Sequence, residues 1–279
     1  MAFPFLHRNK SKDSKTEMSF VDHLEALRWH IIRSVIAISV LAIGVYIYID
    51  WIFDMIITAP ISKDFITYTG LCNVSHRLNM GDALCISPVD VNMQTTAYST
   101  QFVSSISIAV VIAFIIAFPY ICWEFWRFIK PALSFKEIKN TRGAIFWVSF
   151  FFFCGAAFGY FLLAPFTFSF LANFTLGTKH IITTRPTLAD YIDNLMNIIL
   201  GTGVAFELPV VSFVLTKIGI LTPTFLKTYR KYAYIVILIV AAIITPSPDW
   251  MSQTIVALPL IVLYEISIII SKRVYKKLA

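Results

Sequence analysis

One acidic side chain lies in the middle of a long apolar run, where a charge is costly. Glu207 lies in the stretch 201–209, with Gly203 one turn before it and Pro209 two residues after it. A glycine and a proline kink would open a groove through which water or a polar group reaches the carboxyl group. Because ionised groups in lipid are rare and usually functional, the pattern predicts an intramembrane polar site at Glu207. The alternative is a protonated Glu207 that donates one hydrogen bond between helices.

A second group of acids lies on an amphipathic helix expected from residue 19 to residue 28. At 100° per residue its two faces separate cleanly. The apolar face carries Phe20, Leu24, Leu27 and Ile31, and the opposite face carries Asp22, Glu25 and Trp29. The apolar face can lie on the bilayer and leave the carboxylates facing the cytosol or another loop. The alternative is an ordinary solvated face with a Glu25–Arg28 ion pair.

A third candidate lies in the aromatic run 118–137. Its aromatic residues indicate a membrane interface, and Pro131 breaks the chain before a short basic stretch. Glu137 is an acid among Lys130, Lys136 and Lys139. Taken alone, such an acid is most often part of a surface ion pair.

The elements that hold these residues belong in a membrane. The chain has 279 residues, of which 58% are hydrophobic and 14% charged. One soluble core of this length could not bury so much apolar surface, so lipid must serve as part of the solvent. The net charge of +7 is distributed in short clusters beside apolar runs, which indicates membrane topology and no nucleic-acid partner. We expect a polar tail at 1–18 and a single polytopic membrane domain at 19–279.

Apolar runs predict an all-α protein with about six membrane-spanning helices. They cover residues 32–50, 102–123, 144–165, 194–216, 231–245 and 252–271. The fifth would reach only about 22 Å at 1.5 Å per residue. It is either a short spanning segment that thins the bilayer or half of a re-entrant hairpin.

The Lys and Arg residues predict the orientation. Most of the 23 lie in the N-terminal region, the loops 124–142 and 217–231, and the C-terminal tail. The exceptions are Lys63, Arg77, Lys179 and Arg185. Because cytoplasmic loops carry the positive charge, both termini are expected in the cytoplasm.

The loop at about 51–100 is then outside, and it contains Cys72 and Cys85. In an oxidising compartment these two cysteines could form a disulfide, and otherwise they are free thiols.

Several of these motifs together resemble the TatC family. They are the His23–Arg28 start, Phe118-Pro119, the Trp126 to Glu137 run, Gly159-Tyr-Phe with Pro165-Phe, Phe206-Glu207-Leu-Pro209, and Thr245-Pro-Ser-Pro-Asp249 with Gln253. The resemblance runs from about residue 19 to the tail. It implies the core receptor of the twin-arginine translocase in the bacterial inner membrane. It also implies a concave, cup-like bundle with short fifth and sixth helices, and no cofactor.

The resemblance implies roles for individual residues. Twin-arginine signal peptides would bind a cytoplasmic patch in which Glu137 is the leading acid, supported by Phe128 and Pro131. Planar guanidinium groups match carboxylates in pairs of hydrogen bonds, which suits such a patch. Many relatives have a Glu where this chain has Ala26, so Asp22 and Glu25, which flank that position, are expected to share its role.

Two further sites follow from the same resemblance. Glu207 matches the intramembrane acid of the concave face, in contact with the inserted signal peptide or partner helices. Thr245 and Gln253 match a polar site where single-span subunits of the TatA and TatB type dock. Self-association is expected as well, and the proton-motive force is the implied energy source.

The main alternative is a proton-coupled secondary transporter that uses Glu207. Against it, the sequence shows no inverted repeat and only one acid in mid-membrane. An intramembrane enzyme is a weaker reading, because no His-Glu-x-x-His motif is present and the five histidines lie outside or at the edges of the spans.

Overall fold

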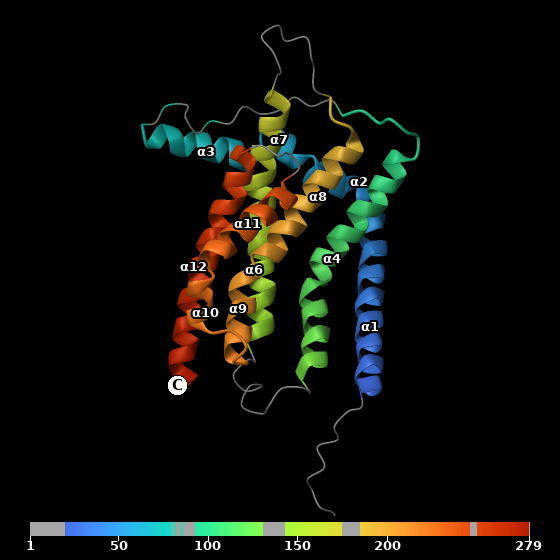
Figure 1. Cartoon of the computed structure of the whole chain (residues 1–279). Helices are drawn as coiled ribbons and strands as arrows, with labels where there is room; N and C mark the ends of the chain where they lie inside the picture. Colours follow the sequence, from blue (N-terminus) through green and yellow to red (C-terminus); the bar gives the residue numbers. More distant parts are fainter. Residues whose placement is uncertain are drawn as a thin grey trace, which may run out of the picture.

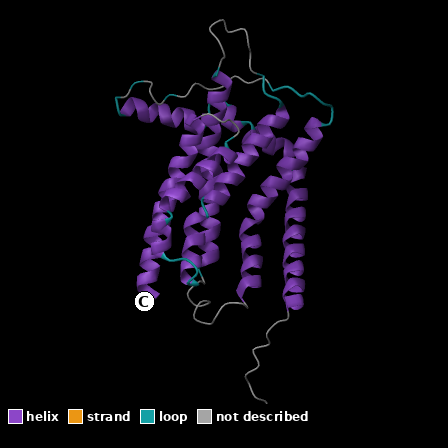
Figure 2. Ribbon diagram, in the orientation of Figure 1, coloured by secondary structure: helices purple, strands orange, loops and turns teal. Residues whose placement is uncertain are grey.

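The computed structural model describes residues 20–79, 81, 85, 93–130, 143–174, 185–245 and 250–278. Within these ranges every regular element is a helix (Figure 2). In chain order the elements are α1 (Phe20–Ile47), α2 (Ile49–Ile52), the π-helical turn Phe53–Ile57, the 3₁₀ turn Ala59–Ile61, α3 (Ile66–Arg77), α4 (Thr100–Ile129), α6 (Ala144–Phe158), the π-helical turn Gly159–Leu163, α7 (Ala164–Asn173), α8 (Leu188–Ala205), α9 (Leu208–Lys217), α10 (Pro223–Thr228), α11 (Arg230–Ile244) and α12 (Trp250–Leu278).

Five helical stretches are long and apolar enough to cross a membrane. They are Leu24–Ile47, Thr100–Ile129, Ile145–Asn173, Leu188–Lys217 and Ser252–Lys276. The prediction of an all-helical protein with long apolar helices is therefore confirmed. The fifth predicted segment corresponds to α11, whose 15 residues span about 22 Å. The count of six spans stays a prediction.

The expectation of a short sixth helix is wrong. α12 has 29 residues and continues past the predicted end at 271 to Leu278. The helix continues because one of its faces still finds partners: Val274 is buried, and the hydroxyl groups of Ser271 and Thr216 lie 2.8 Å apart. α9, which carries Thr216, therefore packs against the last turns of α12.

The N-terminal amphipathic segment is not a separate helix. α1 runs without a break from Phe20 to Ile47, so residues 20–28 form the first turns of the first span. Toward its other end α1 exposes apolar side chains such as Val40, Ile43 and Ile47. Such a surface requires lipid, because exposed apolar area of this kind is unfavourable in water.

Figure 1 shows the start of α1 and the end of α12 at one end of the bundle, with α2 and α3 at the opposite end. The shared end agrees with the expectation that both termini lie on one side. α3 crosses the far end, where the Tyr68 hydroxyl donates to the carbonyl of Pro60 at 2.8 Å. Burial raises the pKa of Tyr68 to about 12, so this donor stays protonated.

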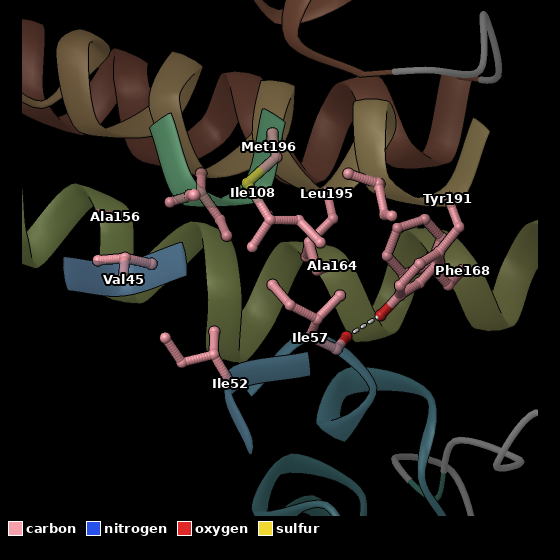
Figure 3. Packing of buried hydrophobic residues seen from close by; sticks show 13 residues of the cluster. Val45, Ile52, Ile57, Ile108, Ala156, Ala164, Phe168, Tyr191, Leu195 and Met196 are labelled. Atoms are coloured by element: carbon pink, nitrogen blue, oxygen red, sulfur yellow. Dashed lines mark hydrogen bonds between the residues drawn. The ribbon is translucent and has the colours of Figure 1, made fainter. Parts of the chain in front are cut away.

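The core nearest α2 is built from many elements that are far apart in sequence (Figure 3). Ile57, Ile108, Leu195 and Ala164 are almost completely buried there. The Tyr191 hydroxyl donates to the carbonyl of Ile57 at 2.5 Å, which satisfies a polar group inside this apolar cluster. The core fixes α8 against the π-helical turn Phe53–Ile57.

Candidate functional site

A contact between a histidine and a carboxylate joins α1 and α4 at the end of the bundle that carries the C-terminus. The imidazole Nδ1 of His30 on α1 contacts the carboxylate of Glu124 on α4. Glu124 is only 1% exposed, whereas His30 is 16% exposed. A buried carboxylate requires partners, so this pair holds the two helices together at this end.

Three more side chains surround the same carboxylate. Arg127 donates to it at 3.2 Å, the Tyr120 hydroxyl donates at 3.2 Å, and an Arg33 nitrogen lies 4.0 Å away. Both arginines are nearly half exposed. Glu124 is therefore the buried centre of a cluster whose cationic members reach the surface. We call Glu124 with His30, Arg33, Tyr120 and Arg127 the α1–α4 cluster.

Glu124 was not predicted from the sequence as a site residue, because the aromatic residues around it in the sequence indicate only a membrane interface. A signal was present: Glu124 lies four residues after Tyr120 and three before Arg127, one helical turn from each. Its partner His30 lies 94 positions away, and no local pattern reports such a contact.

The structure brings part of the predicted signal-peptide patch beside this cluster. The ring of Phe128 lies edge-on to the imidazole of His30, with centroids 6.1 Å apart. Glu25 is exposed on α1, five residues before His30. The side chain of Asp22 lies outside the described residues, although its backbone belongs to α1. Pro131 and Glu137 also lie outside the described residues, directly after the chain leaves α4.

Glu207 lies at the junction between α8 and α9, inside the fourth long apolar stretch. It is 8% exposed, and neither carboxylate oxygen has a hydrogen-bond partner among the described residues. The backbone of Phe152 lies next to this carboxyl group. A buried, unpartnered carboxyl group is a site that an incoming polar group could satisfy.

The groove expected beside Glu207 is filled by packing. A Cβ atom at Gly203 would lie 2.8 Å from the ring of Phe152, and one at Gly155 would lie 2.5 Å from the carbonyl oxygen of Thr202. These glycines bring α6 and α8 together and do not open a water path. The space next to Gly203, one turn before Glu207, is thus occupied by the ring of Phe152.

Thr245 and Gln253 lie where α11 and α12 adjoin. Thr245 is buried, and its hydroxyl donates to the carbonyl of Ala241 at 3.0 Å. The Gln253 amide donates to the carbonyl of Leu238 at 3.0 Å, so it ties the start of α12 to α11. Both side chains therefore already take part in the packing of this helix pair.

Glu265 forms a second polar link between α11 and α12. Its carboxylate pairs with Arg230 at the start of α11, and it accepts a hydrogen bond from the Tyr234 hydroxyl. This acid near the end of the last apolar run therefore ties the two helices together.

Cys72 and Cys85 are joined by a disulfide, with Cα atoms 4.3 Å apart. His76 lies beside them, and the three side chains are close enough to form a small metal-binding group. In the disulfide form the sulfur atoms offer no thiolate ligands, so these residues act as a covalent link. Cys122 and Cys154 are free.

Comparison with known proteins adds the family. The family model for the Sec-independent protein translocase protein TatC matches residues 22–259. The TatC protein of Blattabacterium sp. subsp. Periplaneta americana is 40% identical over 269 residues, which cover 95% of this chain and 99% of that protein. The TatC protein of Aquifex aeolicus is 31% identical and covers 93% of this chain and 97% of that protein.

A solved structure agrees with the sequence matches. The crystal structure of the twin-arginine translocase receptor TatC superimposes with a TM-score of 0.70 at 32% identity, over 90% of this chain and 99% of that one. TatC proteins are components of a protein translocase and do not form a family of catalytic enzymes. This chain therefore belongs to the TatC family of Sec-independent protein translocase proteins.

Proposed function

We propose that this chain is the receptor of a twin-arginine translocase and binds the signal peptides of folded substrates. The observation that carries the proposal is the contact between the His30 imidazole and the Glu124 carboxylate. It holds the helix that bears Glu25 beside the helix that ends just after Phe128. This neighbourhood of α1 and the end of α4 supports a shared patch. A similar chain of known structure is described as a translocase receptor, which supports the same assignment.

In this proposal the two signal-peptide arginines pair with acids near the place where α1 contacts α4. Glu137 remains the leading acid, supported by Phe128 and Pro131, and Glu25 and Asp22 are the proposed acids from the N-terminal segment. Arginine suits such a patch because its charge is permanent and its donors are planar. The contact between α1 and α4 also includes the apolar side chains of Leu27 and Phe125, against which the rest of the peptide can lie.

Glu207 would serve the deeper part of the bound peptide or a partner helix. Its two carboxylate oxygens have no hydrogen-bond partner among the described residues. A donor group on an incoming helix could therefore bind them without displacing a protein donor. Thr245 and Gln253 would serve single-span subunits of the TatA and TatB type at the α11–α12 pair. Each such hydrogen bond contributes only about 0.6–2 kcal/mol in a membrane, which suits an exchangeable partner.

The proposed setting is the bacterial inner membrane, with both termini in the cytoplasm and with self-association of the chain. The distribution of Lys and Arg in the sequence supports this orientation. The start of α1 and the end of α12 lie at the same end of the bundle, which is consistent with this orientation (Figure 1). Transport would draw on the proton-motive force, since the sequence has no nucleotide-binding motif.

Site-specific photocrosslinking tests the receptor assignment. A photoreactive residue is placed at Glu25 or at Phe128, and the control probe is placed at Asp54, at the opposite end of the bundle. We expect both patch probes to crosslink a twin-arginine signal peptide and to lose the crosslink with a twin-lysine peptide. Equal crosslinking of the twin-arginine and twin-lysine peptides, or solute flux through the chain alone, would favour the function of a secondary transporter instead.

A further inference from the structure

A cationic cavity lies between α10, α11 and the last turns of α12, away from the α1–α4 cluster. Its volume is about 460 Å³, a size that suits a small ligand or a headgroup. Five of its lining residues are cationic and one is acidic. They are Lys227, Arg230, Lys272, Arg273 and Lys276, with Glu265 as the acid and with Ile268 and Ile269 as the apolar wall.

Helix geometry explains why these residues share a cavity. The members on α12 lie at positions 265, 268, 269, 272, 273 and 276, a spacing of three and four that places them on one helix face. Lys227 on α10 and Arg230 at the start of α11 face them from the other side. The cavity is therefore formed by three elements.

The charge in this cavity is only partly compensated. Glu265 is occupied by Arg230 and by the Tyr234 hydroxyl. Among the described residues, Lys227, Lys272, Arg273 and Lys276 have no ion-pair partner, and all four are exposed. Cations gathered around a cavity repel one another, so an anion that binds there gains favourable energy from several of them at once.

An apolar track continues from the cavity along α12. Leu258, Val262, Ile266 and Ile269 are all exposed, and they recur at intervals of three and four residues. This stripe is about 16 Å long at 1.5 Å per residue, close to the thickness of one leaflet of a bilayer core. Arg273 extends the same stripe into the cavity.

We propose that this cavity binds the phosphate headgroup of an anionic phospholipid, whose acyl chains lie along the exposed stripe of α12. A basic pocket between helices at the membrane surface fits a phospholipid headgroup. The apolar track distinguishes a lipid from a free phosphate ion, which has nothing to place against Ile269 and Val262. This site is separate from the proposed signal-peptide patch and does not depend on it.

Native mass spectrometry of the purified full chain tests the proposal. The chain in neutral detergent is titrated with phosphatidylglycerol, and phosphatidylcholine with the same acyl chains is the uncharged comparison. The test variant is Lys272→Gln with Lys276→Gln. The matched control is Lys130→Gln with Lys231→Gln, two exposed lysines, one directly after α4 and one on α11, that do not line the cavity.

We expect the cavity variant to bind phosphatidylglycerol about tenfold more weakly than the unmodified chain does, and the control to change little. Replacement by arginine, Lys272→Arg with Lys276→Arg, should retain the affinity, which excludes a folding defect as the cause. Equal loss in the test and control variants, or no loss in either, would overturn the proposal. Displacement of the lipid by inorganic phosphate at comparable concentration would overturn the lipid assignment, because the site would then bind a free anion.

Discussion

His30 on α1 contacts Glu124 on α4, and this contact is centred on a carboxylate that is almost completely buried. The two residues are separated by 94 positions in sequence, yet they define one end of the helix pair. His30 reaches the surface, as do Arg33 and Arg127. The pair thus links the internal packing of α1 and α4 to the surface where the signal peptide is proposed to bind.

Removing the buried acid should weaken the helix pair. We expect Glu124→Ala to lower the free energy of unfolding by about 1–3 kcal/mol, because His30 and Arg127 lose a buried charged partner. Arg33→Gln is the control, since Arg33 is nearly half exposed and lies 4.0 Å away, and it should cost less than about 1 kcal/mol. Denaturant unfolding in detergent, followed by tryptophan fluorescence, compares the two. Equal losses would mean that Glu124 has no special part in anchoring α1.

The close approach of α6 and α8 should tolerate no added side chain at Gly155. A Cβ atom there would lie 2.5 Å from a backbone oxygen and 2.7 Å from Phe206 Cβ. We expect Gly155→Ala to destabilise the chain by about 1–3 kcal/mol through overpacking. Gly44→Ala is the matched control, because an added methyl group at this position of α1 would meet nothing within 4 Å. Thermal unfolding distinguishes them, and a neutral Gly155→Ala would contradict the packing described for Glu207's surroundings.

Export should depend more on the charge of the side chain at position 207 than on the presence of a carboxyl group there. Glu207→Gln keeps the shape and stays neutral, so export of twin-arginine substrates should decline only modestly. Glu207→Arg places a permanent cation in an enclosed apolar site and should abolish export, since such burial costs several kcal/mol. Export is measured in intact cells as the amount of mature substrate outside the inner membrane, after equal membrane levels of each variant are verified. Equal defects in the two variants would argue against a buried carboxyl site.

Glu137 should be required for export and not for membrane insertion. Glu137→Arg replaces the proposed partner of a signal-peptide arginine by a like charge, so we expect export to be lost. Asp54→Arg also replaces an acid by arginine, in the π-helical turn that follows α2, and should leave export near normal. Membrane fractionation provides the level of each variant. Export at the normal rate by Glu137→Arg would remove this residue from the patch.

The disulfide should report the side of the membrane on which the first loop lies. We expect Cys72 and Cys85 to resist alkylation in cells until a reductant is added, because disulfides persist in the oxidising periplasm. Cys122 and Cys154 provide the internal comparison and should be unlinked in the same peptide map. Two reduced thiols at positions 72 and 85 would place the loop in a reducing compartment and reverse the proposed orientation.

The positions of the long helices could be predicted from sequence, because a run of apolar residues long enough to cross a bilayer has few other structures available. The short length of α11 was predicted from the 15-residue apolar run at 231–245. The end of α12 was not, because Ser271 and Val274 are buried by α9 and other elements that lie far away in sequence. The continuity of α1 was not predicted, because the amphipathic pattern at 19–28 and the apolar run from residue 32 indicated two separate segments.

The candidate site was predictable where it depends on a single unusual residue. Glu207 is unusual by its position alone, and its burial agrees with that expectation. The closure of its groove depends on Phe152, which approaches from another helix and has no marker in the sequence. Glu124 was missed for a related reason, since its significance comes from His30 and Arg33 on α1.

In the proposed receptor function, this chain selects signal peptides by their paired arginines. The decisive measurement is the equilibrium affinity of the purified full chain for a fluorescent twin-arginine signal peptide and for its twin-lysine counterpart. We predict that the twin-lysine peptide binds at least about tenfold more weakly, because an ammonium group cannot make the planar paired hydrogen bonds of a guanidinium group. Equal affinity of the two peptides would contradict the receptor assignment.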